Sequence, residues 1–302
     1  MPSFSLRGLT LTLPDKSLRG GLERAFTTGL YEHQEADAIL AHLQPGDRFL
    51  DLGAGIGFLC ALAARVVGAA AVAGVEPVPD TLALAQANLA ANGFDGVKLI
   101  RGAVVGEARR GEGTEVEFGE RPAFWASALR NAEGWPANAR VIRVPAKPIG
   151  KLLARLQPTV ICCDIEGGEL EVLTQPLPGV RLVVVELHPA IYGEDGVARI
   201  ASALAAEGFA PEAKGAKGAT VVFRRASGGA LAEGAGLLNP TLADRVGAVP
   251  DHAKLRHLHW PDPDIGQNLP LNLDLQRLAI QKPESPVRLL QGNPPIVMGL
   301  RS

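Results

Sequence analysis

The sequence has few cysteines, and they do not form a cross-linking or metal-binding pattern. Only Cys60, Cys162 and Cys163 occur among the 302 residues, each inside an apolar run. They show no Cys-x-x-Cys spacing, and their odd number differs from the even-numbered framework that staples small secreted domains. We therefore expect buried, reduced thiols and a cytoplasmic protein.

Long apolar runs are also missing. Ser3, Arg7 and Thr10 interrupt the N-terminal segment, which therefore lacks the continuous apolar stretch of a signal peptide. No later segment approaches the eighteen unbroken apolar residues that predict a membrane-spanning helix. We expect neither a leader peptide nor a membrane partner.

An excess of positive charge is absent as well. The formal net charge is −2, from 30 Lys and Arg against 32 Asp and Glu residues. Nucleic-acid binding usually requires a clustered basic surface that neutralises phosphates, so we expect no nucleic-acid partner and favour small or neutral ligands. With 47% hydrophobic and 21% charged residues, the chain has the composition of a globular protein.

Short apolar segments alternate with helical patterns through most of the chain. The apolar segments predict buried strands at 48–52, 71–76, 97–103, 159–164 and 181–187, with a last strand at 220–224. The helical patterns are at 35–43, 58–67, 80–92, 149–156, 169–174 and 197–207. This alternation predicts an α/β fold with a doubly wound, mostly parallel sheet, whose strands all present their carboxyl ends at one edge.

Other segments do not follow this alternation. Alternating apolar residues over 4–13 predict an N-terminal edge strand. Residues 106–143 are rich in Gly, Glu and Arg, which predicts an irregular insertion or an extra hairpin near the rim of the ligand site. After Arg225 the composition shifts and becomes rich in proline.

These patterns divide the chain into three parts. Residues 1–28 form an N-terminal embellishment, and residues 29–225 form the ligand-binding α/β domain. Residues 226–302 form a Pro-rich C-terminal extension that is loop-rich or partly disordered.

A glycine turn follows the first buried strand. Its spacing is Gly-x-Gly-x-Gly, and Phe58 stands where a dinucleotide-binding fingerprint has its third glycine. A carboxylate at Asp51 would repel a pyrophosphate but suits a cofactor with an ammonium and a sulfonium group. The missing third glycine and the carboxylate at Asp51 both favour S-adenosylmethionine over NAD as the cofactor. Because glycines let a ligand approach the backbone closely, the cofactor-binding residues predicted here are Asp51, Gly53, Ala54, Gly55 and Gly57.

Two further strand ends complete the predicted cofactor site. Glu76 ends the second strand, where a carboxylate can accept hydrogen bonds from both hydroxyls of a ribose; a solvated glutamate before Pro77 is the alternative. Gly102 and Ala103 close the third strand beside the expected adenine. We therefore assign Glu76, Pro77, Gly102 and Ala103 to the cofactor site.

Three side chains are candidates for the chemistry. Asp164 and Glu166 lie two residues apart at the fourth strand end, so both can point toward the cofactor crevice, and His188 follows the fifth strand on the same side. We expect all three to be catalytic, with Asp164 also at the cofactor. They would orient a hydroxyl, take its proton or hold a divalent cation, although no metal site is predicted. The alternatives are helix capping by Glu166 and Glu169 and a structural His188.

Several motifs also follow one another in a recognisable order. They are Gly29-Leu30-Tyr31-Glu32, Pro45-Gly46-Asp47, the glycine turn from Asp51 to Gly57, Asp164-Ile165-Glu166-Gly167-Gly168-Glu169, and Val183-Val184-Val185-Glu186-Leu187-His188-Pro189. Together, over residues 29–224, they resemble the FkbM family of methyltransferases.

The resemblance implies a class I methyltransferase fold, which is Rossmann-like, in residues 29–225. It implies transfer of a methyl group from S-adenosylmethionine to a hydroxyl oxygen, often on a carbohydrate or another small molecule. It also suggests that Tyr31 and Glu32 fold over the cofactor as a lid. The extension after Arg225 matches nothing in the family.

Three other functions stay open at this point. They are an NAD-binding oxidoreductase, a binding module without turnover, and an RNA methyltransferase, for which the basic residues Arg109, Arg110 and Arg121 are the only indication. In the extension, His252, His257 and His259 with Asp262 and Asp264 do not have the spacing of a metal site. The segment Asn293-Pro294-Pro295-Ile296 lacks the aromatic residue typical of amino-group methyltransferases.

Overall fold

The computed structural model describes residues 1–226 except 19–20, 109–112, 122–125, 131–133 and 136–137. The predicted extension lies outside this part from residue 227 onward. The same holds for Arg109 and Arg110 and for the histidines and the Asn-Pro-Pro segment discussed above.

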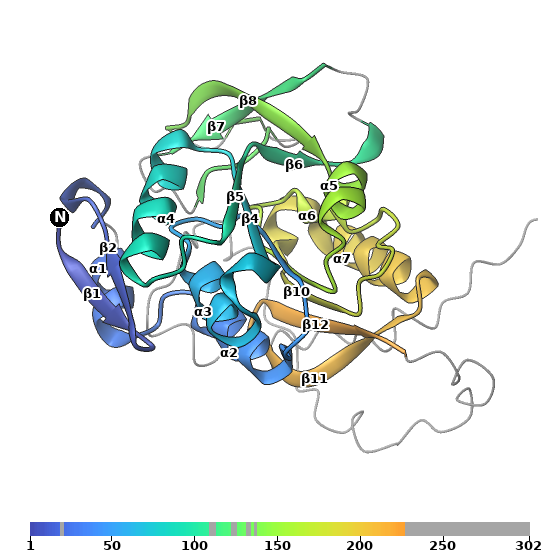
Figure 1. Cartoon of the computed structure of the whole chain (residues 1–302). Coiled ribbons are helices and arrows are strands. Elements are labelled where there is room, and N and C mark those ends of the chain that lie inside the picture. The colour runs from blue at the N-terminus through green and yellow to red at the C-terminus, as the bar shows by residue number, and fades with distance from the viewer. Residues whose placement is uncertain (19–20, 109–112, 122–125, 131–133, 136–137, 227–302) are drawn as a thin grey trace, which may run out of the picture.

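A seven-stranded sheet forms the centre of the molecule (Figure 1). It is doubly wound and mostly parallel, as predicted, but has one strand more than the six that we predicted. Its five central strands are parallel and pair in the order β10-β9-β3-β4-β5, while β12 lies antiparallel between β10 and the edge strand β11. The strands are β3 (Phe49–Leu52), β4 (Val72–Glu76), β5 (Lys98–Arg101), β9 (Val160–Cys163), β10 (Leu182–Glu186), β11 (Phe209–Lys217) and β12 (Thr220–Arg225).

Helices cover both faces of this sheet. Phe49 and Val160 pack on one face, whereas their neighbours Leu50 and Ile161 pack on the other, because successive side chains of a strand point to opposite faces. This explains why the strands are apolar throughout. The first face is covered by α2 (His33–His42), α3 (Phe58–Val67) and α4 (Pro79–Ala91), and the second by α5 (Ile149–Leu156), α6 (Glu169–Val172) and α7 (Pro189–Ala206).

The N-terminal segment is a hairpin and not the single edge strand that we predicted. Strands β1 (Ser3–Leu6) and β2 (Leu9–Thr12) pair with each other in a separate two-stranded sheet. Arg7 and Gly8 have φ angles of 50° and 76°, and positive φ at both central residues gives the tight turn typical of hairpins. A short 3₁₀ helix, η1 (Asp15–Ser17), and the unpredicted helix α1 (Leu22–Thr28) follow.

Three other elements differ from the prediction by more than a few residues at their ends. The segment 97–103 divides at Gly102, whose φ of 149° ends β5 and starts β6 (Ala103–Val105) in another sheet. The last helix begins earlier than residue 197, at Pro189, and Gly193 interrupts it with non-helical angles that obscure the apolar period. Strand β11 was missed because most of its residues are exposed and it lacks an apolar face.

The insertion forms the extra hairpin, which was one of our two alternatives. Strands β7 (Glu115–Glu120) and β8 (Arg140–Pro148) pair antiparallel, and β6 joins β8 to give a three-stranded sheet, order β6-β8-β7. A second 3₁₀ helix, η2 (Ala69–Ala71), precedes β4. No helix in the described ranges is both long and apolar enough to cross a membrane. The cytoplasmic location stays a prediction.

Candidate active site

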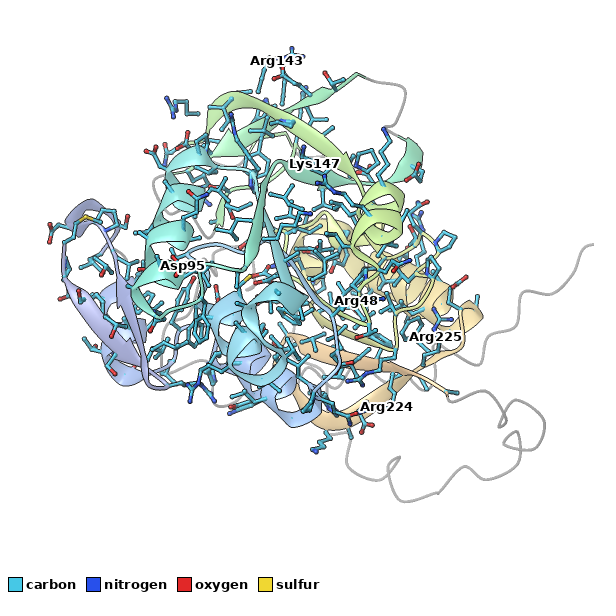
Figure 2. All side chains as sticks on the ribbon, viewed as in Figure 1. Arg48, Asp95, Arg143, Lys147, Arg224 and Arg225 are labelled. Carbon is cyan, nitrogen blue, oxygen red and sulfur yellow. The ribbon has the colours of Figure 1, made fainter. Side chains whose placement is uncertain are left out.

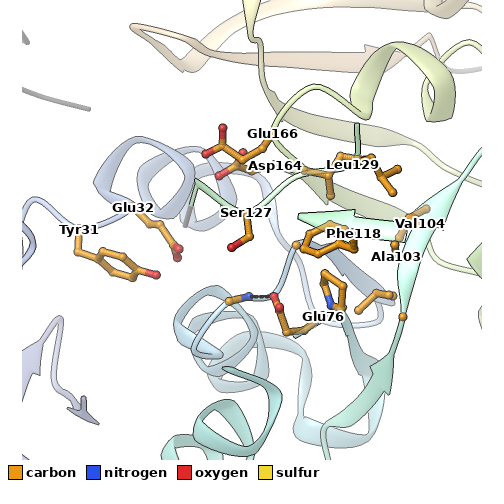
Figure 3. Close-up of a pocket in the computed structure, with 16 residues that line it drawn as sticks. Tyr31, Glu32, Glu76, Ala103, Val104, Phe118, Ser127, Leu129, Asp164 and Glu166 are labelled. Carbon is orange, nitrogen blue, oxygen red and sulfur yellow. Dashed lines mark hydrogen bonds between the residues drawn. The ribbon is translucent and has the colours of Figure 1, made fainter. Parts of the chain in front are cut away.

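A pocket opens where the central sheet presents its carboxyl ends (Figure 3). The predicted site residues that line it are Tyr31, Glu32, Gly53, Gly55, Glu76, Pro77, Gly102, Ala103, Asp164 and Glu166. Lining residues that the sequence did not reveal are Val75, Val104, Phe118, Ser127, Leu129 and Ile165.

The glycine turn is shaped by two close approaches. Gly53 has a φ of 90°, and a side-chain carbon there would lie 1.9 Å from the backbone oxygen of Asp164. Gly55 has a φ of 49° and faces Tyr31 and Glu32 across the pocket. Only glycine fits the first of these positions, and the second brings bare backbone to the pocket wall.

Four predicted residues lie outside the pocket lining. Asp51 is only 2% exposed beneath the turn, where its carboxylate accepts a hydrogen bond of 3.3 Å from the Cys60 thiol, and burial raises its pKa to about 7. Ala54 is buried, and Gly57 packs α3 against Ala85 of α4. His188 lies behind Asp164 and Glu166. Asp51, Ala54 and Gly57 therefore lie beneath the glycine turn and support its shape.

Glu76 joins the second strand to the glycine turn. Its Oε2 accepts a hydrogen bond of 3.1 Å from the backbone N–H of Gly55, and its Oε1 accepts one of 2.9 Å from that of Val78. The side chain is 6% exposed, and burial raises its pKa to about 8 despite these two hydrogen bonds. Each carboxylate oxygen has a second lone pair, so Glu76 can hold the turn and still accept hydrogen bonds from a ligand.

Tyr31 and Glu32 reach the pocket from the chain segment before α2. The Tyr31 ring stacks on Phe26 with centroids 4.3 Å apart and leans on Phe58 at 5.9 Å. Its hydroxyl lies beside the Glu32 carboxyl group, and burial, with Glu32 as the next cause, raises the pKa of Tyr31. Tyr31 is thus both a packing residue and part of the pocket wall.

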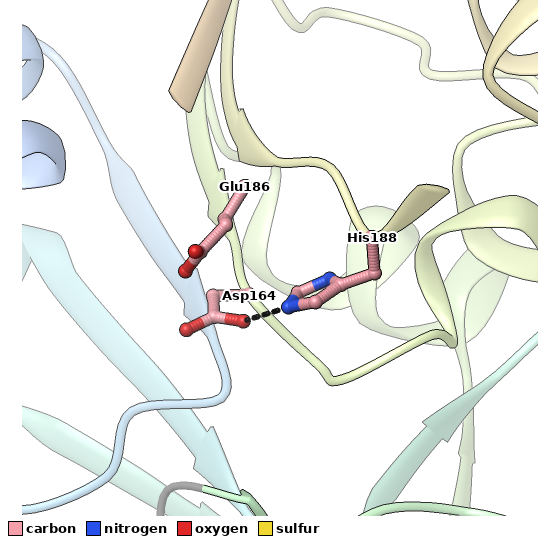
Figure 4. A group of neighbouring side chains, drawn as sticks. All are labelled: Asp164, Glu186 and His188. Carbon is pink, nitrogen blue, oxygen red and sulfur yellow. Dashed lines mark ion pairs between the residues drawn. The ribbon is translucent and has the colours of Figure 1, made fainter. Parts of the chain in front are cut away.

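Beyond the turn, carboxylates and an imidazole gather at the ends of β9 and β10. His188 Nε2 lies 3.7 Å from both Asp164 Oδ1 and Glu166 Oε2. On the other side of the ring, Nδ1 lies 3.3 Å from Glu169 Oε1. Glu186, the last residue of β10, completes the group beside Asp164 (Figure 4). We call these five residues the acid–histidine cluster.

Glu169 holds the loop after β9 in shape. It is 0% exposed, and its two oxygens accept hydrogen bonds from the backbone N–H groups of Ile165 at 2.8 Å and Gly167 at 2.9 Å. Both N–H groups belong to the loop before α6, and no described side chain caps the N-terminus of that helix, so Glu169 does not have the capping role considered for it. The loop holds Glu166 at a φ of 51°, a conformation that is uncommon for a residue other than glycine.

Burial and mutual repulsion set the electrostatics of the cluster. Burial raises the pKa of Asp164 and Glu186, and it raises that of Glu166 to about 8 together with the neighbouring Asp164. Burial alone would lower the pKa of His188, but the carboxylates around it, Glu169 first, raise it well above its usual value. The cluster therefore accepts positive charge or protons readily.

The strand order with its single reversed strand β12 is that of the class I methyltransferases, and the glycine turn stands at the crevice that the fold provides for a nucleotide-like cofactor. The fold and the pocket define this protein as an S-adenosylmethionine-dependent methyltransferase. Residues 51–211 match the sequence model described as the methyltransferase FkbM domain. The chain belongs to the FkbM methyltransferase family, and the NAD-binding alternative has no support.

Solved structures with a similar fold act on different acceptors. They include a ribosomal protein L11 methylase from Lactobacillus delbrueckii subsp. bulgaricus (15% identity, TM-score 0.38, 65% of this chain and 79% of that chain covered). A mitomycin 7-O-methyltransferase is similar at 16% identity and a TM-score of 0.35 (67% and 56% covered). An RNA methyltransferase from Salinibacter ruber has 17% identity and a TM-score of 0.34 (64% and 88% covered). A comparison with curated proteins gave no match.

Proposed function

We propose that this protein transfers a methyl group to a hydroxyl group of a small molecule or glycan. The observation that carries the proposal is that Asp164 and Glu166 line the same pocket as the glycine turn, with His188 3.7 Å behind both. A hydroxyl must lose its proton as it is methylated, and this cluster places proton-accepting groups beside the cofactor pocket. In this proposal residues 29–225 form the catalytic domain, residues 1–28 an N-terminal addition and residues 226–302 an extension.

The pocket suits S-adenosylmethionine at both of its ends. Glu76 would accept hydrogen bonds from the ribose hydroxyls, and Gly102 and Ala103 would border the adenine with the apolar Val104 and Phe118. The methionine end would lie along Gly53 and Gly55, facing the carboxyl groups of Glu32 and Asp164, which complement its positive charges. Asp51, Ala54 and Gly57 would shape the turn. Bound there, S-adenosylmethionine supplies a methyl group on positively charged sulfur.

The chain's own residues then position and deprotonate the acceptor. Asp164 and Glu166 orient the hydroxyl, and its proton passes to the acid–histidine cluster. As the O–H bond breaks, the oxygen forms a bond to the methyl carbon, and the electrons of the broken C–S bond stay on sulfur. Alignment supplies roughly 7–11 kcal/mol of such a barrier, whereas a general base contributes a factor of roughly 10²–10⁴, so positioning is the larger contribution.

The hairpin insertion forms the acceptor side of the pocket. Leu129 and Ser127 line this part of the pocket next to Phe118, and they offer one apolar surface and one hydroxyl group. Such a wall suits a compact organic acceptor. The third arginine of the RNA alternative, Arg121, has a buried Nε and does not form an exposed basic surface.

One observation favours RNA as a second candidate acceptor. A separate, open groove is lined by Lys147, Lys151 and Arg155 together with Glu115, and none of the three cations forms an ion pair with a described residue. Lys147 is labelled in Figure 2. Three such cations would attract a phosphate backbone. If RNA is the acceptor, its affinity must fall steeply with rising salt and must drop when these three residues are replaced by glutamine.

Calorimetric titration with S-adenosylhomocysteine tests the proposed function. We expect micromolar binding by the wild-type chain and no binding of NAD. Glu76→Gln should weaken binding by about 10–100-fold, because the amide replaces a carboxyl oxygen with an NH₂ group and leaves buried polar groups unpaired, at a cost of roughly 1–3 kcal/mol. Glu23→Gln, at an exposed glutamate of α1, is the matched control and should bind like the wild type.

An acceptor screen follows binding. Release of S-adenosylhomocysteine is measured with glycosides and polyketide alcohols, then with RNA at two salt concentrations. Turnover with an alcohol supports the proposal. If the cofactor binds but only amines or RNA are methylated, the proposed transfer to a hydroxyl group of a small molecule or glycan is contradicted, although the family assignment is unaffected.

A further inference from the structure

Two neighbouring strand ends bring three metal-ligand side chains together. Asp164 directly follows β9, Glu186 ends β10, and His188 comes two residues later. Cys163 pairs with Val185 in the parallel ladder, so Asp164 and Glu186 occupy the next pair of positions. One donor atom from each of Asp164, Glu186 and His188 lies within 4.8 Å of the other two (Figure 4).

This spacing is close to that of a coordination sphere. A divalent transition-metal ion lies about 2.0–2.2 Å from nitrogen and oxygen ligands, which places neighbouring ligand atoms about 3–4 Å apart. Rotations of the side chains, without backbone movement, would close the remaining difference.

One buried carboxylate oxygen of the group accepts no hydrogen bond from the described part of the chain. Asp164 Oδ1 is buried and forms no hydrogen bond with any described residue. His188 Nε2 lies 3.7 Å from this oxygen, which is too long for a hydrogen bond. Buried polar atoms are nearly always paired, so the space between these two atoms is a site at which both would bind a third.

Glu169 supports the histidine in the manner of a metal site. It lies 3.3 Å from His188 Nδ1, and two backbone N–H groups hold its own oxygens in place. Ligating histidines usually direct their other ring nitrogen toward a carboxylate, which fixes the tautomer. In the neutral tautomer with its proton on Nδ1, the Nε2 lone pair of His188 would face Asp164 and Glu166.

We propose that Asp164, Glu186 and His188 bind a divalent transition-metal cation at the rim of the pocket. Two carboxylates and one imidazole suit Mn²⁺, Fe²⁺, Co²⁺ or Zn²⁺ better than Mg²⁺ or Ca²⁺, which prefer oxygen ligands throughout. Because Asp164 lines the pocket, the open positions of the cation face the acceptor. Its role there, holding the acceptor oxygen, rests on the proposed function; the binding itself does not.

Titration with Mn²⁺ tests the site directly. The full chain is dialysed against a chelator, and the six-line electron paramagnetic resonance signal of free Mn²⁺ is followed as the ion is added. We expect binding that weakens by at least about tenfold in Glu186→Gln and in His188→Asn. The control Glu194→Gln, at an exposed residue of α7, should bind like the wild type. Because His252, His257 and His259 lie in the same chain, binding that survives in both site variants would overturn the proposal.

A second measurement does not depend on how the variants fold. Pulsed resonance of Mn²⁺ bound to the wild-type chain should show coupling to a histidine ¹⁴N nucleus. No binding at about 1 mM Mn²⁺, or binding without that coupling, would refute the metal site. Binding of S-adenosylhomocysteine is measured on the same metal-free protein. If S-adenosylhomocysteine binds and Mn²⁺ does not, the metal site is refuted and the methyltransferase proposal is retained. If Mn²⁺ binds and S-adenosylhomocysteine does not, the metal site is retained and the methyltransferase proposal is refuted.

Discussion

The backbone oxygen of Asp164 closes directly over Gly53, so that a side-chain carbon at Gly53 would lie only 1.9 Å from it. The two residues belong to the loops after β9 and β3, which are neighbours in the sheet. The turn predicted to hold the cofactor and the cluster predicted to handle the acceptor therefore share one contact. A change at Gly53 must move both.

Gly53→Ala should cost about 2–5 kcal/mol of unfolding free energy and abolish binding of S-adenosylhomocysteine. It combines the strain of a positive φ with a backbone clash. Gly46→Ala is the matched control, because Gly46 has a φ of 92° but nothing within 4 Å of the added carbon. We expect it to cost about 1–2 kcal/mol from strain alone and to bind normally. Denaturant unfolding and calorimetry measure both, and equal effects of the two variants would contradict the clash.

Tyr31→Phe should weaken S-adenosylhomocysteine binding by about 3–10-fold, because it removes a hydroxyl from the pocket wall and keeps the stack on Phe26. Its stability should change by less than about 1 kcal/mol. Tyr192→Phe is the comparison, since the Tyr192 hydroxyl accepts a hydrogen bond of 2.6 Å from the His188 backbone N–H and lies outside the pocket lining. That variant should lose about 1 kcal/mol of stability and bind the ligand normally. If Tyr31→Phe instead lost stability and bound the ligand normally, Tyr31 would have a packing role only.

Asp51→Asn should stabilise the cofactor-free protein at high pH. Burial raises the pKa of Asp51 to about 7, above its unfolded value, so the folded state binds the extra proton between about pH 4 and 7. The cost of ionising Asp51 grows across that window and is complete above it. We expect the variant to be about 1–3 kcal/mol more stable than the wild type at pH 8.5 and nearly equal at pH 4.

Thermal unfolding at the two pH values checks this, with Asp195→Asn, at an exposed aspartate, as control. Because Asp51 does not line the pocket, its variant should lose less than about tenfold in S-adenosylhomocysteine affinity. A larger loss than in Glu76→Gln would show that Asp51 contacts the cofactor.

Asp47→Asn should destabilise the fold by about 2–3 kcal/mol without changing ligand affinity. Arg181 Nε and the Thr159 hydroxyl each donate a hydrogen bond of 2.8 Å to Asp47 Oδ1, and the Gln44 backbone N–H donates one to Oδ2. Burial opposes these hydrogen bonds, yet the pKa of Asp47 is lowered. The stabilisation is therefore present above the unfolded pKa of Asp47 and is lost as the pH falls through the folded pKa.

Chemical denaturation at pH 7 and pH 3 measures this difference. It should be large at pH 7 and smaller at pH 3, and Asp95→Asn, at an exposed position, should show none. A constant difference would mean that the charge of Asp47 does not matter.

Much of the site follows from strand ends, which sequence patterns locate well. Glu76, Asp164 and His188 were found because apolar strands end just before them and parallel strands share a carboxyl edge. Glu186 belongs to the same edge, but nothing in its local sequence distinguishes a cluster member from a solvated residue. The sequence likewise could not predict that the Asp51 side chain points beneath the turn.

The sequence predicted that the insertion lies near the rim of the site, but it did not single out the residues with which the insertion lines the pocket. Phe118, Ser127 and Leu129 come from an insertion with weak periodicity, and only the pairing of β8 with both β6 and β7 carries that insertion to the site. The N-terminal hairpin was missed because its turn depends on a positive φ at Arg7. Residues other than glycine seldom adopt a positive φ, so the sequence did not predict a turn there.

The sequence alone determined the parallel sheet, the glycine turn and the order of the acidic motifs, because these depend on local apolar period and on spacing along the chain. Tertiary structure decided which carboxylates meet. Glu169, Glu186 and Asp164 surround His188 only because β9 and β10 pair in one register and the loop after β9 folds back on itself. Long-range pairing and burial set those distances, and no local pattern encodes them.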